Sequence, residues 1–166
     1  MPTGLRLAAN LAVNGFTSRD VIDQELPILA SLQPGFVSLL VGVNDVVQGV
    51  APEAFRSNGS AILDALVAAV SSRRIVVVSM PDYTVTPEGA AYGDPEDRRR
   101  AIVAFNAILE ESARQLDVAF VDISDVSRRV QDDPALVASD GLHASAAQYL
   151  LWVDEIAPFV EALLAD

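Results

Sequence analysis

The stretch FVSLLVGVND, residues 36–45, joins an apolar run of strand length to the polar group Gly-Val-Asn-Asp. Three further runs have the same apolar character, and they are LRLAANLA (5–12), RIVVVSM (74–80) and VAFVDIS (118–124). Continuous apolar runs this short are typical of strands that are buried on both faces of a parallel sheet. We therefore predict four parallel strands at these positions.

Longer segments with helical spacing of apolar residues separate or follow these runs, and they cover residues 18–32, 51–72, 94–116 and 144–165. In the last of them, five apolar residues are predicted to share one face: Leu150, Val153, Ile156, Val160 and Leu163. Strands that alternate with helices predict an α/β fold, in which helices cover both faces of a parallel sheet. The 166 residues contain no internal repeat or linker, so we expect a single domain over residues 1–166.

The composition argues against several kinds of partner. The net charge of -12 repels phosphate backbones and anionic lipids, so neither nucleic acid nor a membrane is an expected partner. There is no cysteine, which excludes disulfides and thiolate chemistry. The basic run Arg98, Arg99 and Arg100 is interpreted as a solvated helix face. Neither a membrane span nor a signal peptide is visible, which by itself predicts a cytoplasmic chain, but an incomplete start would leave the localisation unknown.

Polar residues follow each of the four predicted strands. Because ligands of open parallel sheets bind outside the carboxyl ends of the strands, these residues are the candidates for a site. They are Gly15, Asn44 with Asp45, Asp82, and finally Asp140 with His143.

His143 is the only histidine in the chain, and Asp140 precedes it by three positions. At this spacing a carboxylate can reach the near ring nitrogen of the imidazole, which leaves the far nitrogen free to accept a proton. The alternative is that Asp140 only caps the start of the last helix. A glycine N–H at position 15 and the amide of Asn44 are suitable donors to a developing oxyanion. The alternatives are a tight turn at Gly15 and an Asx-turn at Asn44.

Three segments together carry a resemblance to a known family. NLAVNGFTSRDV, LLVGVNDV and DGLHASAAQYLLW resemble the second, third and fifth conserved blocks of the SGNH (GDSL-like) hydrolases, in that order. The similarity extends from about Asn10 to about Phe159. It implies a flavodoxin-like three-layer α/β/α sandwich with a parallel sheet, and hydrolysis of a small ester or acyl substrate by a serine nucleophile, without a metal or cofactor.

The resemblance also implies roles for individual residues. It assigns Gly15 and Asn44 to the oxyanion hole and His143 to general base and then general acid, with Asp140 orienting His143. We further expect Asp45 and Tyr83 to contact the substrate, with Tyr83 in the irregular stretch 81–97.

The nucleophile of this family is the serine of a Gly-Asp-Ser block after the first strand, and the sequence contains no such block. We therefore expect an N-terminally incomplete domain that lacks the first strand and is inactive by itself. Among the serines that could replace the nucleophile, Ser79 is the least unsuitable, since it lies at a strand end. The others are Ser18, Ser38, Ser139 and Ser145.

A missing first strand leaves a gap between the runs 5–12 and 36–42, because the first strand of a flavodoxin-like sheet lies in its middle. Three outcomes are open. The natural gene can begin further upstream, the two flanking strands can pair directly, or another chain can supply the pairing and form a homodimer through the exposed strand near the N-terminus.

Two other functions compete with the hydrolase. The first is a non-catalytic SGNH-like domain that binds a small ligand or a protein partner. The second, which has weaker support, is a metal-dependent phosphatase-like enzyme that uses the scattered groups Asp45, Asp82, Asp140 and His143.

Overall fold

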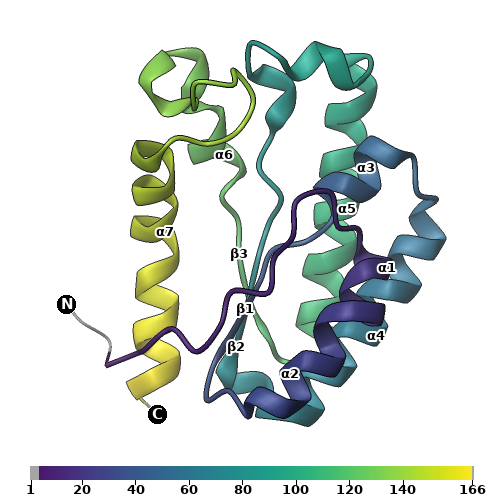
Figure 1. The fold of residues 1–166 in the computed structure, drawn as a ribbon, viewed down its shortest axis with the longest axis vertical. Coiled ribbons are helices and arrows are strands. Elements are labelled where there is room, and N and C mark those ends of the chain that lie inside the picture. The colour runs from purple at the N-terminus through teal and green to yellow at the C-terminus, as the bar shows by residue number, and fades with distance from the viewer. Residues whose placement is uncertain (1–3, 166) are drawn as a thin grey trace.

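Three short parallel strands run through the middle of the molecule, and helices lie on both sides of them (Figure 1). The structure is a computed structural model that describes residues 4–165. The strands are β1 (Val37–Leu39), β2 (Ile75–Val78) and β3 (Ala119–Val121), in the order β1-β2-β3. Three of the four predicted strands are therefore confirmed.

The register places β2 in the centre of the sheet. Val37 pairs with Ile75 on one side, and Val76 pairs with Ala119 on the other. All four residues of β2 are buried, as its uninterrupted Ile-Val-Val-Val sequence requires. Within the described chain β1 pairs with β2 alone, so its other edge is open.

One face of the sheet is covered by α4 (Pro52–Val70) and α5 (Pro95–Gln115). Their phenylalanines stack at the centre of this layer, with the rings of Phe55 and Phe105 4.3 Å apart. A continuous helical segment lies on the same side (Figure 1), and it consists of α1 (Ser18–Asp20), a π-helical turn (Val21–Glu25) and α2 (Leu26–Leu32). The short α3 (Val43–Gln48) follows β1 at the top of the sheet.

The opposite face is covered by α7 (Ala146–Ala165), which packs Trp152 and Val160 against Val76 and Val78 of β2. The short α6 (Ser124–Ser127) follows β3. The apolar face predicted for α7 is not buried along its whole length, because Leu150 is 66% exposed and Val153 54% exposed. The remaining elements are 3-10 turns at Ser72–Arg74, Tyr83–Val85, Gly89–Tyr92, Arg128–Gln131 and Pro134–Leu136.

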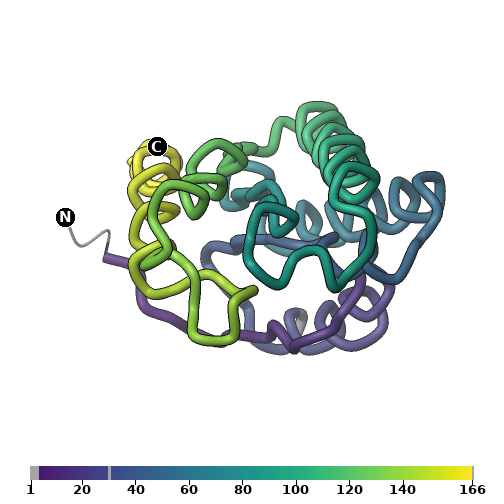
Figure 2. The backbone as a smooth tube through the Cα atoms, turned by 90° about the horizontal axis from the view of Figure 1, so that it is seen from above, coloured from purple at the N-terminus to yellow at the C-terminus, as the bar shows by residue number. Residues whose placement is uncertain are grey.

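The predicted strand over residues 5–12 is wrong, because this segment is irregular and joins no sheet. It passes along the β1 side of the molecule without pairing with β1 (Figures 1 and 2). An apolar run becomes a strand only when a neighbouring strand takes up its N–H and C=O groups, and none of the three described strands pairs with this segment. Among the residues described, no helix combines the length and the apolar character needed to cross a bilayer.

Candidate active site

The structure brings Asp140 and His143 into direct contact. They lie on a loop that is closed by an antiparallel bridge between Val137 and Ala144. Asp140 Oδ1 accepts hydrogen bonds from the backbone N–H groups of Leu142 (2.9 Å) and His143 (3.0 Å). Asp140 Oδ2 lies 2.6 Å from His143 Nδ1. Asp140 therefore holds both the main chain and the ring of His143.

The hydrogen bonds keep the Asp140 carboxylate ionised. The Leu142 N–H, followed by the His143 ring and the His143 N–H, lowers the pKa of Asp140 to about 2 from its ordinary value of 3.8. An ionised carboxylate at Nδ1 favours the tautomer in which Nδ1 donates and Nε2 is free to accept a proton. The His143 side chain is 60% exposed, and Nε2 has no hydrogen-bond partner among the described residues.

A second loop supports the one that carries His143. The Glu88 N–H donates to the Gly141 carbonyl at 3.0 Å. Gly141 has φ +74, and a Cβ at this position would lie 2.9 Å from Glu88 Cγ. Only glycine combines this backbone conformation with so close an approach, so Gly141 allows the loop of Asp140 and His143 to pack against Glu88.

Two hydrogen bonds join the turn at Gly15 and Phe16 to α3, the helix that carries Asn44. Asn44 Nδ2 donates to the Phe16 carbonyl at 2.9 Å, and Gln48 Nε2 donates to the Gly15 carbonyl at 3.2 Å. The Asn44 amide retains a second N–H, and the Gly15 N–H has no acceptor among the described residues. Two donors are thus available on the segments that these hydrogen bonds join. Figure 1 shows this junction and the loop of His143 toward the same end of the sheet.

Asp45 does not face a substrate site in this structure. Its side chain is fully buried, and its carboxylate accepts hydrogen bonds from the Ser18 N–H (2.8 Å) and the Ser18 hydroxyl (2.5 Å). Burial raises the pKa of Asp45, against the opposing effect of the Ser18 hydrogen bonds. The expectation that Asp45 contacts substrate is corrected accordingly, since its carboxylate fixes the start of α1.

Tyr83 is also buried, with 7% of its surface exposed. Its ring packs edge-on against Tyr92, with 6.2 Å between centroids, and burial raises the pKa of its phenol. The hydroxyl has no hydrogen-bond partner among the described residues. Tyr83 therefore packs inside the 81–97 loop, and its buried side chain is not exposed for the expected contact with a substrate.

None of the candidate serines makes a hydrogen bond to the His143 ring, although Ser139 lies on the same loop. Ser79 is fully buried, and its hydroxyl donates to Asp122 at 2.9 Å. Ser18 is buried against Asp45, and the Ser145 hydroxyl donates to the Ala135 carbonyl at 2.8 Å. No hydrogen bond joins a described serine to the His143 ring.

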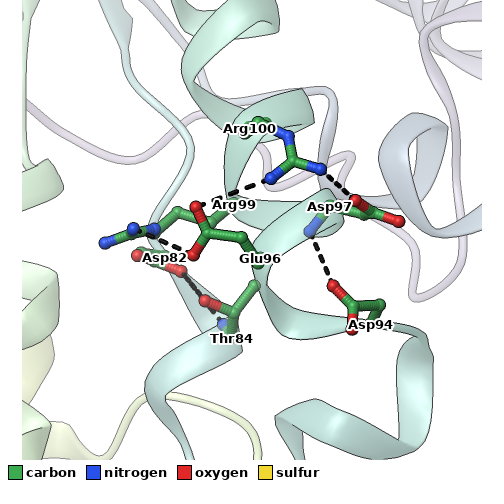
Figure 3. Close-up of polar contacts among 7 residues, drawn as sticks. All are labelled: Asp82, Thr84, Asp94, Glu96, Asp97, Arg99 and Arg100. Atoms are coloured by element: carbon green, nitrogen blue, oxygen red, sulfur yellow. Dashed lines mark hydrogen bonds and ion pairs between the residues drawn. The ribbon is translucent and has the colours of Figure 1, made fainter.

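The three arginines at the start of α5 have two different roles: Arg99 and Arg100 form ion pairs on the helix surface, whereas Arg98 donates to main-chain carbonyls. Arg99 pairs with Glu96 at 3.0 Å, and Arg100 contacts both Glu96 and Asp97 on the exposed helix surface (Figure 3). Arg98, in contrast, donates to the carbonyls of Tyr92 (2.9 Å) and Val46 (2.5 Å). Arg98 therefore ties α3 to α5, a structural role that the sequence pattern did not reveal.

Close to the same helix start, Asp82 accepts hydrogen bonds from the Thr84 N–H (3.1 Å) and hydroxyl (2.6 Å) (Figure 3). Asp82 thus caps a 3-10 turn. The phosphatase-like alternative required this carboxylate to act as a metal ligand together with Asp45, which is enclosed by Ser18.

Comparison with known proteins identifies the class. The model of the GDSL-like Lipase/Acylhydrolase family matches residues 2–151, so the chain belongs to this family of hydrolases. A search of curated proteins found no match.

Similar solved structures support the same fold. An acetyl xylan esterase from Geobacillus stearothermophilus is 21% identical, with a TM-score of 0.70 over 88% of this chain and 68% of that chain. An alpha/beta hydrolase enzyme from the metagenome of Lake Arreo, Spain, is 19% identical, with a TM-score of 0.70 over 90% of this chain and 70% of that chain. The predicted SGNH-type α/β/α fold is therefore confirmed. Catalytic mutants of the acetyl xylan esterase replace a serine, an aspartate and a histidine.

Proposed function

We propose that this chain carries the acid–base and oxyanion-binding parts of a serine hydrolase that acts on small esters or acyl groups. The observation that carries the proposal is the 2.6 Å contact between Asp140 and His143 Nδ1, which leaves Nε2 exposed. The similar acetyl xylan esterase supports it, because the aspartate and histidine replaced in its catalytic mutants are also three positions apart.

The chemistry follows from the available groups. His143 Nε2 takes the proton of a serine hydroxyl as its oxygen attacks the ester carbonyl, and the ionised Asp140 stabilises the imidazolium that forms. The Gly15 N–H and the free N–H of Asn44 donate to the resulting oxyanion, each contributing about 3 kcal/mol. His143 then gives the proton to the leaving alcohol, and water repeats the cycle on the acyl-serine.

Because no described serine makes a hydrogen bond to the His143 ring, the chain by itself is expected to hydrolyse p-nitrophenyl acetate poorly. A fluorophosphonate is expected to label none of its serines. Rapid stoichiometric labelling of one serine would show that the nucleophile is already present and would overturn this part of the proposal.

The direct test supplies a serine nucleophile within the same chain. Extension of the amino end with a strand and a Gly-Asp-Ser turn is expected to produce hydrolysis of p-nitrophenyl acetate. His143→Ala in the extended chain should lower kcat by roughly 10²–10⁴-fold. An extended chain that keeps its activity after His143→Ala would refute the role of His143.

The second candidate is a non-catalytic SGNH-like domain that binds a ligand or partner. One observation favours it, namely that the described serines make hydrogen bonds elsewhere or none to His143. An extended chain that folds and takes up the strand, but neither hydrolyses esters nor reacts with a fluorophosphonate, would favour this second candidate.

A further inference from the structure

The turn that carries Gly15 is exposed and depends on hydrogen bonds for its position. Residues 13–15 are all exposed, and a Cβ at Gly15 would meet nothing within 4 Å, so this side of the turn faces open space. Inside the turn, the Phe16 N–H donates to the Val13 carbonyl at 3.2 Å. This bond closes the turn, but it does not fix the distance of the turn from the rest of the molecule.

The side chains of α3 supply contacts from outside the turn. Asn44 Nδ2 donates to the Phe16 carbonyl at 2.9 Å, and Gln48 Nε2 donates to the Gly15 carbonyl at 3.2 Å. Residues four positions apart lie on the same face of a helix, one turn from each other. One face of α3 therefore holds two consecutive carbonyls of the segment that leads into α1 (Figure 1).

A third contact from α3 acts further along the chain. The Asp45 carboxylate accepts hydrogen bonds from the N–H and the hydroxyl of Ser18, and Asn58 Nδ2 donates to the Ser18 hydroxyl at 2.9 Å. These bonds fix the start of α1, three residues beyond Gly15. Gln48 is thus the α3 side chain that acts on Gly15 itself.

α3 is a firm support for such contacts, because it is anchored in the core. Val46 is 2% exposed, and its carbonyl accepts a hydrogen bond from Arg98 of α5. A Cβ at Gly42, where α3 begins, would collide with Met80 and Phe55, so the main chain lies directly against the core there. Side chains on rigid elements hold a site more precisely than side chains on loops.

The distance between the Gly15 turn and α3 matters for the chemistry of an oxyanion. Two donors stabilise one developing negative charge only if each lies about 2.7–3.1 Å from the same oxygen. A displacement of about 1 Å can cost a reaction roughly 10²-fold in rate. Because the Asn44 amide lies on the helix and the Gly15 N–H lies on the turn, a contact that ties the turn to the helix sets the spacing of the two donors.

We propose that Gln48 is a positioning residue for the oxyanion hole. Its side-chain amide holds the Gly15 carbonyl to α3, which keeps the Gly15 N–H at a fixed distance from the Asn44 amide. Gln48 acts through Gly15 and makes no contact with the reacting atoms. The clamp on the turn stands on the hydrogen bonds alone, whereas its effect on catalysis rests on the proposed function.

The first test measures the backbone mobility of the full chain by ¹⁵N relaxation at neutral pH. In Gln48→Ala the order parameter of Gly15 should fall from about 0.85 toward about 0.6, while that of the buried Ser18 stays unchanged. Gln24→Ala is the matched control, because Gln24 is also exposed and donates at 3.2 Å, but to Asp20. An unchanged Gly15 in Gln48→Ala, or an equal loss in Gln24→Ala, would overturn the clamp.

Two further variants show whether the donor group of Gln48 is responsible. Gln48→Glu has nearly the same size, but its ionised carboxylate can only accept hydrogen bonds. It should therefore release Gly15 as Gln48→Ala does. Gln48→Lys regains N–H donors and should restore part of the order at Gly15. Equal mobility of Gly15 in the glutamate and lysine variants would overturn the role of the hydrogen bond.

The second test measures catalysis in the extended chain described above. Gln48→Ala should lower kcat for p-nitrophenyl acetate by about tenfold, which is less than the roughly 10²–10³-fold that loss of a whole donor costs. KM should stay nearly unchanged, because the oxyanion is present only in the transition state. The midpoint of the pH profile should also stay unchanged, since His143 is unaltered.

The outcomes separate this inference from the proposed function. An active extended chain in which Gln48→Ala leaves kcat unchanged, or raises KM alone, would overturn the positioning role while the proposed function stands. An extended chain that folds and shows the response of Gly15 to Gln48→Ala, but hydrolyses no ester, would refute the proposed function and leave the clamp in place.

Discussion

The Asp140 carboxylate is set by its local hydrogen bonds rather than by burial. The side chain is half exposed, yet the Leu142 and His143 N–H groups and the His143 ring lower its pKa to about 2 from an ordinary 3.8. Because the folded-state pKa is depressed, this group stabilises the fold above pH 4 and loses that contribution as the pH falls toward 2. A pH titration of the Asp140 carboxyl carbon by NMR should therefore show a midpoint near 2.

Asp140→Asn tests the same linkage through stability. The loss of stability between pH 4 and 2 should be smaller in this variant than in the unaltered chain, because one acid with a depressed pKa is gone. Unfolding by urea at several pH values measures the difference. A midpoint for Asp140 near 3.8, or the same pH dependence in both proteins, would contradict the hydrogen-bonded geometry.

Asp45 contributes to stability rather than to substrate binding. Asp45→Ala leaves the buried N–H and hydroxyl of Ser18 without their acceptor, so the free energy of unfolding should fall by about 2–4 kcal/mol. Asp64→Ala, at an exposed position of α4, is the matched control and should change it by less than about 0.5 kcal/mol. Urea unfolding followed by circular dichroism distinguishes the two. Equal, small effects would mean that the Ser18 contact is not formed.

At the level of elements, Gly42 determines how β1 leads into α3. It has φ +119, and a Cβ would lie 2.6 Å from Met80 Sδ and 2.9 Å from Phe55 Cζ. Gly42→Ala should therefore destabilise the protein by about 2–4 kcal/mol, through backbone strain and overpacking together. Gly15 has φ +88, but a Cβ at this position would meet nothing within 4 Å. Gly15→Ala should therefore destabilise the protein by about 1–2 kcal/mol, through backbone strain alone. Thermal unfolding compares the two, and a larger effect at Gly15 would contradict this packing.

Elements with local signals could be predicted from the sequence. Asp94 caps α5 by accepting the Asp97 N–H, and Thr17 caps α1 through Asp20, as residue types near each helix start indicate. The Asp140–His143 contact was predictable for the same reason, because both residues lie on one short loop.

Features that depend on distant neighbours could not be predicted. The burial of Asp45 is decided by Ser18, 27 positions away, and residues 5–12 have the composition of a strand but do not join the described sheet. In α7 the periodicity predicted an apolar face, but Trp152 lies in the core while Leu150 is exposed. Periodicity alone could not show which part of this largely apolar helix faces the sheet.

For the whole molecule, charge repulsion between copies opposes association through the exposed apolar surface of one groove, which lies between residues 4–13 and 36–43. Leu7 is 79% exposed and Leu40 44% exposed, while the net charge is -12 and the sequence pI about 4.3. At pH 8 and low salt, repulsion between molecules should keep the chain dispersed, and near pH 4.3 this repulsion vanishes. We therefore expect light scattering to rise as the pH approaches the pI.

Two double variants that add the same charge separate the effect of the groove from that of net charge. Leu7→Asp with Leu40→Asp interrupts the groove surface, whereas Val103→Asp with Leu150→Asp adds two carboxylates on α5 and α7, at positions that are 62% and 66% exposed. Both pairs shift the pI equally, so a difference in scattering at the pI of each variant reports the apolar groove itself. Lower scattering from the groove variant is expected, because association at zero net charge is driven by the burial of apolar surface. Equal scattering from the two variants would mean that the groove surface does not drive association.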